Sequence, residues 1–168
     1  MRVAATASQE LHNGQIFYSM LEEVEVAHPD KTSGRKLGGQ CYCGAVRYAV
    51  ADEFLYAAIC HCSNCRRTTG SAFKPFAGVE RGKLRITTGA DNLLIYGGEK
   101  AHDAHCKTCG SLLYSLVRDG AFVHVAMGTL IDDPTIRPTH HIFVGSKASW
   151  DVIADDLPQY EGHVPPVG

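Results

Sequence analysis

The sequence predicts a mainly β domain of antiparallel strands that is held together by metal. Short apolar runs separated by turn residues repeat from Gly39 onward, which is typical of antiparallel sheets. They do not alternate with helical segments as in a βαβ fold. In addition, seven cysteines gather in three short clusters, and an odd number of thiols cannot all form disulfides. A chain of 168 residues is long enough to bury one core around such a frame.

We expect residues 1–36 to form an N-terminal extension and residues 37–168 to form the zinc-binding domain. Apolar side chains recur at helical spacing within the extension, which predicts one amphipathic helix. They are Ile16, Phe17, Met20, Leu21 and Val24. Pro29 would end this helix, and residues 30–38 would form a polar linker. The helix either packs on the domain without activity or offers a surface to a protein partner.

The domain is expected to contain a series of short strands. They span residues 45–50, 55–60, 76–79, 84–87, 93–96, 112–117, 121–127 and 142–144. Gly97 and Gly98 form a turn, and Asp119-Gly120 is a strong hairpin signal between the two longest later runs. The order of these elements favours hairpins over crossover connections.

Charge and composition limit the class of partner. The chain is 45% hydrophobic and 20% charged, with a formal net charge of −2. Thiolates that hold zinc would make it more negative, so we expect no nucleic-acid partner, which usually needs a basic face. No apolar run is long enough for a signal peptide or a membrane span, which predicts a cytoplasmic protein with no membrane partner. In that reducing compartment, clustered cysteines favour metal over disulfides.

The cysteines divide as four plus three, which predicts two zinc ions per chain. The four are Cys41, Cys43, Cys106 and Cys109, and the three are Cys60, Cys62 and Cys65. Sulfur atoms on one tetrahedral zinc lie roughly 3.8 Å apart, given a Zn–S bond of about 2.3 Å. A glycine after each of the two outer pairs permits the tight bend that this spacing requires. We interpret the complete site as structural and the incomplete one as catalytic.

Three protein ligands and one open position are the geometry of a catalytic zinc site. The alternative is a closed site with His61, His102 or His105 as the fourth ligand, and spacing alone leaves both open. His61 suits this role least, because on a strand its side chain points away from those of Cys60 and Cys62. An open zinc with three thiolates carries a net negative charge. It therefore suits the binding of an incoming thiol as thiolate better than the activation of water.

Basic and imidazole side chains supply further candidates. Arg66 and Arg67 follow the middle cluster directly, and Lys74 lies shortly after them. They are candidates for binding the carboxylates of a peptide-like thiol; the alternative is solvated surface charge that screens the anionic centre. His140 and His141 precede the last expected strand, where one would face inward as a proton donor or as a structural residue.

Three motifs resemble, in the same order, those of the glutathione-dependent formaldehyde-activating enzyme family. They are GQCYCGAVRY at residues 39–48, CHCSNCRRTTG at residues 60–70 and CKTCGS at residues 106–111. The tail, which ends in DLPQY at residues 156–160, is also similar. The likeness covers about residues 37–160 and leaves the N-terminal extension outside it.

The resemblance implies a β-tent fold in which zinc bridges antiparallel sheets, with one structural and one catalytic ion. It implies that glutathione combines with formaldehyde, or a related small electrophile, to S-(hydroxymethyl)glutathione, which is formally a carbon–sulfur lyase reaction read in reverse. Glutathione would be the co-substrate and the aldehyde the second partner. Because the family also contains a centromere protein, the fold alone does not fix the reaction. A non-catalytic, zinc-stabilised protein-binding module and a thiol redox protein are the alternatives, and no oligomeric state is predicted.

Overall fold

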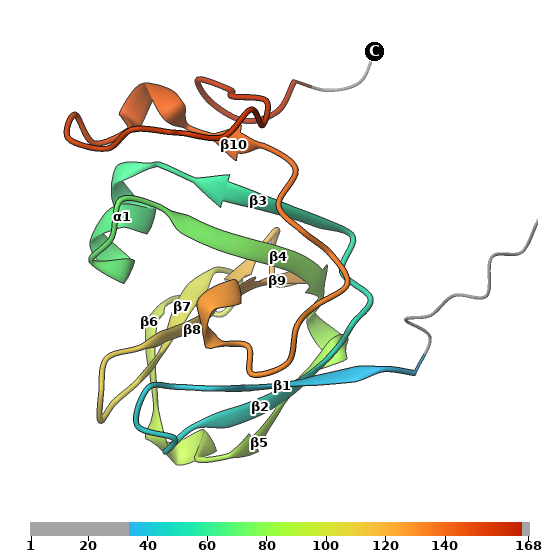
Figure 1. Cartoon of the computed structure of the whole chain (residues 1–168). Helices are drawn as coiled ribbons and strands as arrows, with labels where there is room; N and C mark the ends of the chain where they lie inside the picture. The colour runs from blue at the N-terminus through green and yellow to red at the C-terminus, as the bar shows by residue number, and fades with distance from the viewer. Residues whose placement is uncertain (1–33, 166–168) are drawn as a thin grey trace, which may run out of the picture. The chain divides into compact units, whose positions relative to one another are not determined.

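The computed structural model describes residues 34–165, which contain ten strands in two sheets and one α-helix (Figure 1). The mainly β prediction is therefore confirmed. The amphipathic helix expected at residues 16–24 lies outside the described residues. No helix in the described part has the length and apolar character needed to cross a membrane.

Seven strands form the larger sheet, in the order β10-β3-β4-β9-β8-β7-β6. They are β3 (Tyr56–Cys60), β4 (Lys74–Glu80), β6 (Leu93–Gly97), β7 (His102–Cys106), β8 (Leu112–Val117), β9 (Phe122–Ala126) and β10 (His141–Ile142). All neighbours are antiparallel except β10, which pairs with β3 in parallel. The predicted hairpin joins β8 to β9, where Asp119 and Gly120 both have positive φ angles.

Three strands form the smaller sheet, in the order β1-β2-β5. They are β1 (Lys36–Gln40), β2 (Arg47–Ala51) and β5 (Leu84–Thr88). Strand β1 was not expected, and the predicted linker to residue 38 is wrong because this strand already begins at Lys36. Gly39 in β1 is covered by the ring of Tyr48 on β2, which would lie 2.0 Å from a Cβ at that position. Glycine is therefore a packing requirement in this strand.

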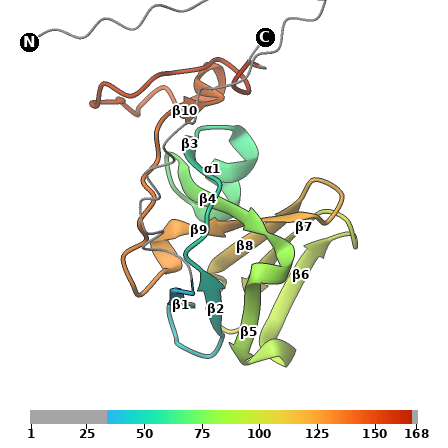
Figure 2. The ribbon, with the colours of Figure 1, turned by 90° about the vertical axis from the view of Figure 1, so that its right-hand side faces the viewer.

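The main core fills the space between the two sheets, which Figure 2 shows from the side. Its buried side chains come from both sheets and include Leu37, Tyr48, Val50, Val79, Leu113, Val123 and Val125. Burial of each large apolar side chain contributes about 1.5–3 kcal/mol before the entropy cost of ordering. A second, smaller cluster around Phe76 and Ile142 packs between β3, β4 and β10.

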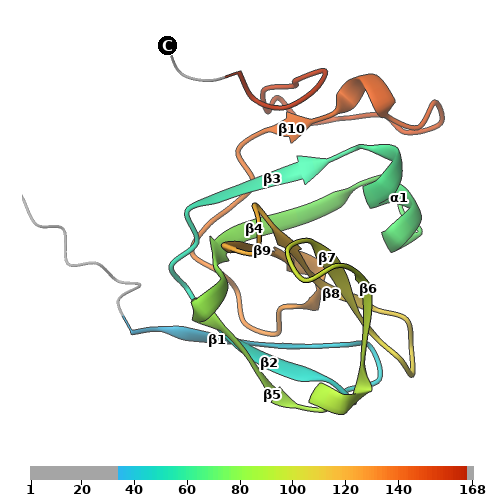
Figure 3. The same ribbon diagram turned by 180° about the vertical axis from the view of Figure 1, so that it is seen from behind.

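Helix α1 (Ser63–Thr69) follows β3 and lies beside the start of β4 (Figure 3). This helix has no apolar face that the sequence pattern would indicate. Residues at its two ends determine where it begins and where it stops. The Cys62 sulfur caps its first turn by accepting the amide hydrogen of Cys65 at 3.3 Å. Gly70 ends it in the left-handed conformation. Short 3-10 turns complete the chain at Arg81–Lys83, Ala90–Asn92, Met127–Thr129 and Val144–Ser146.

Candidate metal centres

Four thiols meet where the two sheets come together. Cys41 and Cys43 lie in the turn between β1 and β2, while Cys106 ends β7 and Cys109 lies in the turn that follows it. All four sulfur atoms lie within 4.8 Å of one another. The Cys41–Cys43 and Cys43–Cys106 sulfur distances are 3.6 and 3.8 Å, close to the spacing of about 3.8 Å on a tetrahedral zinc. Their number, type and spacing fit a closed zinc site.

Neutral donors surround the sulfurs of this four-thiol cluster. The amide of Val46 donates to Cys41 at 3.3 Å, and the side-chain amide of Asn92 donates to Cys106 at 3.4 Å. A hydrogen bond from the Ser111 hydroxyl is the main cause that lowers the pKa of Cys109 to about 5. Such donors favour the thiolate form that zinc requires.

Three thiols form a separate cluster at the end of β3. Cys60 is the last residue of that strand, Cys62 caps α1, and Cys65 lies in its first turn. Their sulfur atoms also lie within 4.8 Å of one another. The hydrogen bond between Cys60 and Cys65 lowers the pKa of Cys65 to about 6 and raises that of Cys60, and the charge of Lys74 further lowers the pKa of Cys65. This donor set fits zinc through three thiolates.

No fourth protein ligand joins this three-thiol cluster within residues 34–165. His61 is fully buried on the other side of the strand, as its alternation with Cys60 predicts. His105 bonds to Thr68 and to the carbonyl of Gly110. His102 donates from Nδ1 to the carbonyl of Gly98. Of the two alternatives from the sequence, the geometry therefore favours three protein ligands over a closed site with histidine.

The three-thiol cluster borders a cavity of about 530 Å³. Lys74 lines it and is only 6% exposed, so the alternative of a solvated surface charge is wrong for this residue. Its Nζ donates to the Ser115 hydroxyl at 3.0 Å, which in turn donates to Oδ1 of Asp103 at 2.5 Å. Because these groups sit on β4, β8 and β7, only the sheet order brings them together. His124 of β9 also lines the cavity, and no sequence motif marks it.

The two arginines that follow the cluster do not line this cavity. Arg66 donates from Nη2 to the carbonyl of Ser146 at 3.2 Å, and Arg67 is exposed on α1. A contact between either arginine and glutathione stays a prediction. His140 packs against Tyr160 and also lies outside the cavity.

Behind the three-thiol cluster, the rings of His61 and His141 form a buried pair. Nε2 of His61 and Nδ1 of His141 lie 2.8 Å apart, and Nε2 of His141 donates to Asp155 at 3.0 Å. The remaining nitrogen of His61 faces Asp151 at 3.6 Å. Burial is the first cause that lowers the pKa of His61. This pair joins the C-terminal segment to the end of β3, beside Cys60. Of the two roles expected for His141, proton donor or structural residue, this contact supports the structural one.

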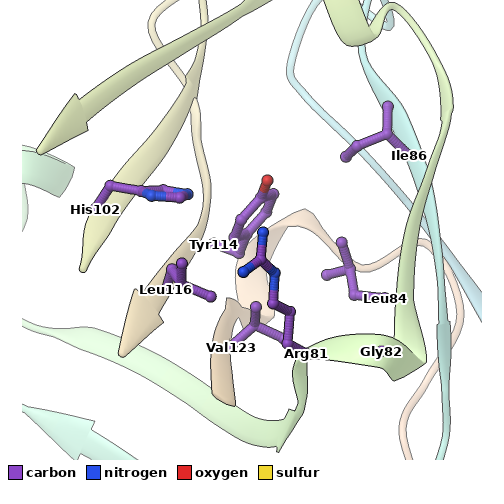
Figure 4. A pocket seen from close by; sticks show the side chains of 8 residues that line it. All are labelled: Arg81, Gly82, Leu84, Ile86, His102, Tyr114, Leu116 and Val123. Atoms are coloured by element: carbon purple, nitrogen blue, oxygen red, sulfur yellow. The ribbon is translucent and has the colours of Figure 1, made fainter. Parts of the chain in front are cut away.

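A second cavity of about 370 Å³ lies on the other side of β8, with Leu84 and Ile86 across from His102 and Leu116 (Figure 4). Tyr114 stands between these groups. It contains no thiol and no carboxylate. Unlike this cavity, the one beside the three-thiol cluster therefore combines several thiols with a buried lysine.

Residues 36–146 match the family model described as glutathione-dependent formaldehyde-activating enzyme. A Halomonas elongata protein provisionally given that name is 30% identical over 124 residues, which span 68% of this chain and 78% of the relative. A Fusarium vanettenii protein with the same provisional name is 29% identical over 86 residues, and the match spans 51% of this chain and 46% of that relative. A crystal structure of a Rhodobacter sphaeroides protein has a TM-score of 0.48 at 32% identity and covers 61% of this chain and 92% of its own.

Proposed function

The chain belongs to the glutathione-dependent formaldehyde-activating enzyme family, and from that premise we propose that it joins glutathione to formaldehyde or a related small electrophile. The product is an adduct of the S-(hydroxymethyl)glutathione type, and the enzyme class is carbon–sulfur lyase. One observation carries the proposal: three thiols converge at the edge of a cavity without a fourth protein ligand in the described chain. This arrangement leaves one side of a metal accessible to a sulfur from outside.

Two zinc ions have different roles in this proposal. The four-thiol cluster would hold the structural ion, because its thiols come from both sheets and supply the four ligands that a closed zinc site requires. The three-thiol cluster of Cys60, Cys62 and Cys65 holds the catalytic one. When bound there, zinc stabilises an incoming thiol in its nucleophilic thiolate form at neutral pH.

The reaction needs no oxidant or reductant. The glutathione sulfur attacks the carbonyl carbon, a carbon–sulfur bond forms, and the π pair of the carbonyl moves to oxygen. The proton lost by the thiol is matched by the proton that this oxygen takes up. Since glutathione and formaldehyde also combine without an enzyme, positioning and enrichment of the thiolate are the main contributions of the protein.

Lys74 provides the positive charge next to this chemistry. Its Nζ is held by Ser115 and lies close enough to Cys65 to lower the pKa of that thiol. A fixed cation beside an anionic thiolate cluster reduces the repulsion that a further thiolate would meet. Arg66 and Arg67 lie farther round α1, and their proposed role is to attract the glutathione carboxylates. All seven cysteines are free, which is consistent with a reducing compartment such as the cytoplasm.

Metal analysis and one substitution test the proposal together. Protein purified without added metal should contain close to two zinc ions per chain, and a chelator should remove the second ion first. Cys60→Ala should remove that ion, abolish glutathione binding and leave the protein folded by circular dichroism. Two-dimensional exchange NMR should show that the wild type accelerates interconversion of glutathione and its formaldehyde adduct. Unfolding of Cys60→Ala, or a single tightly held ion, would favour a non-catalytic binding module instead.

A further inference from the structure

His124 is the only histidine of the cavity lining whose ring hydrogen-bonds to a tyrosine within the described residues. Its Nε2 lies 2.8 Å from the hydroxyl of Tyr56. The ring stacks on Phe76, with centroids 4.1 Å apart and an interplanar angle of 26°. Both contacts fix the ring plane, so the remaining nitrogen, Nδ1, has a defined direction.

The sequence builds this pair across three strands. Tyr56 on β3 and His124 on β9 both pair in register with Gly78 on the intervening strand β4. A Cβ at Gly78 would lie 2.2 Å from Cζ of the Tyr56 ring. The missing side chain therefore allows the tyrosine to lie across β4 and reach the imidazole. Residue 78 is glycine because of this close approach, since its φ angle is not positive.

The tautomer of His124 decides the direction of its hydrogen bond to Tyr56, and the chemistry of the two groups assigns the hydroxyl as the donor. A phenol, with a pKa of about 10, is a much stronger acid than a neutral imidazole N–H, so the hydroxyl is the better donor of the two. The guanidinium of Arg118 lies 5.0 Å from the centroid of the Tyr56 ring, and its charge further favours donation by the phenol. Nε2 of His124 is then the acceptor, which leaves the ring hydrogen on Nδ1. Within residues 34–165, Nδ1 has no hydrogen-bond partner of its own.

The imidazole is neutral at physiological pH. Burial lowers the pKa of His124 to about 3, and the charges of Lys74 and Arg118 act in the same direction. A neutral imidazole with hydrogen on Nδ1 is a fixed hydrogen-bond donor. It differs in this from Lys74, which carries a full charge and already donates to Ser115.

We propose that His124 is a catalytic residue that donates a hydrogen bond from Nδ1 to the carbonyl oxygen of the aldehyde, and that Tyr56 positions it. This rests on the proposed function. As the carbon–sulfur bond forms, negative charge develops on that oxygen, and the hydrogen bond stabilises it without transferring the ring proton. The proton that completes the hydroxyl comes from water and replaces the one released by the thiol.

The sheet places His124 on the same face as the groups near the thiols. His124 pairs in register with Ser115, which holds Lys74, and Lys74 pairs in register with Cys60. Lys74 links the two ends of this face, because its Nζ reaches Ser115 beside His124 and its charge acts on both Cys65 and His124. An aldehyde in the same cavity can therefore turn its carbon toward the thiols and its oxygen toward the imidazole.

Nitrogen-15 NMR of the zinc-loaded protein tests the hydrogen-bond direction without turnover. The His124 ring should show hydrogen on Nδ1 and none on Nε2, and Tyr56→Phe should shift this distribution toward Nε2–H. Tyr48→Phe is the matched control, because Tyr48 also lies across a glycine, but its hydroxyl bonds to Thr129 and not to His124. A wild-type ring with hydrogen on Nε2 would overturn the proposal.

Exchange NMR of the same proteins tests the catalytic role. His124→Leu should lower the maximal rate of adduct formation by about 100-fold with little change in glutathione KM. Tyr56→Phe should lower it less, and Tyr48→Phe should leave it unchanged. Equal rates in the wild type, His124→Leu and Tyr56→Phe, at equal zinc content, would overturn the role of His124 alone. A wild type that does not exceed the spontaneous rate would instead overturn the proposed function, together with the substrate assigned to His124.

Discussion

The two cysteine clusters use the same ligand chemistry but have different surroundings. The four-thiol cluster lies where two sheets meet, and its sulfurs accept hydrogen bonds from neutral groups such as the Val46 amide and the Asn92 side chain. The three-thiol cluster lies at the end of one strand, beside a cavity with a buried lysine. The difference teaches that ligand number and neighbouring charge, more than the cysteine motif itself, separate a structural metal site from a catalytic one.

The largest expected effect comes from the four-thiol cluster. Cys106→Ser should remove the structural ion and lower the free energy of unfolding by at least about 5 kcal/mol, comparable with the whole stability of a domain. Circular dichroism during thermal unfolding should then show no cooperative transition. A Cys106→Ser protein that unfolds cooperatively near the wild-type temperature would show that this cluster does not hold the fold.

The corresponding change in the three-thiol cluster should affect activity and not folding. Cys65→Ala should lower the rate of adduct formation to the spontaneous background, because two thiolates hold zinc too weakly to keep the site loaded. Its thermal transition should stay within a few degrees of the wild type. Loss of the fold in Cys65→Ala would erase the distinction between the clusters.

In the cavity beside the three-thiol cluster, His124 should make the stability of the protein depend on pH. The folded state keeps this imidazole neutral down to about pH 3, whereas the unfolded chain binds a proton near pH 6.5. Below pH 6.5 the unfolded state therefore binds more protons than the folded state. As the pH is lowered further, the free energy of unfolding decreases by about 1.4 kcal/mol per pH unit. Between pH 7.5 and 5.0 the wild type should lose about 2 kcal/mol more than His124→Gln, measured by urea unfolding. Parallel losses in both proteins would contradict a neutral His124 ring in the folded state.

The charge of Lys74 should strengthen zinc binding at the three-thiol cluster and not at the four-thiol cluster. Lys74→Met should weaken zinc binding at the three-thiol cluster by about 10-fold, because the positive charge near Cys65 is lost. The four-thiol cluster should keep its affinity. Lys83→Met is the matched control, since it removes an equal charge that pairs with Glu53 away from the cavity. Chelator competition measures the zinc affinity of each cluster. Equal affinities of the three-thiol cluster in the two variants would show that Lys74 does not contribute to zinc binding.

The smallest effect is expected from Arg67. Because its side chain is exposed on α1 and outside the cavity, it acts on glutathione only through a field that salt screens. Arg67→Ala should raise glutathione KM by about twofold at low ionic strength and leave it unchanged in 0.5 M salt. An unchanged KM at low ionic strength would end its proposed role in glutathione attraction.

Local patterns were enough to predict most strands. The run at residues 112–117 matches β8 in both bounds, and those at 84–87 and 93–96 match β5 and β6 to within one residue. Two strands were missed because their composition is not apolar. Strand β1 contains two glycines, and β7 contains two histidines and an aspartate. Helix α1 was missed because the Cys62 cap, rather than an apolar face, fixes its start.

The candidate site was predictable only where its members are close in sequence. The spacing of the cysteines predicts both groups of thiols, which the structure brings together. The spacing does not predict that Lys74 reaches Ser115 or that Tyr56 reaches His124, because strand order and register create these contacts. The sequence shows the glycine at position 78 but not that the Tyr56 ring lies over it. Contacts of this kind depend on long-range pairing that no local pattern contains.

The parallel pairing of β10 with β3 has a consequence for how the protein is made. Amides of Ile59 and His61 donate to carbonyls of His140 and Ile142, so the thiol-bearing strand is complete only when the last part of the chain is present. The four thiols and the neutral donors beside them all lie at or before Ser111. The ligands of both clusters are therefore synthesised before β10, and the three-thiol site is the later of the two to gain all of its supporting strands.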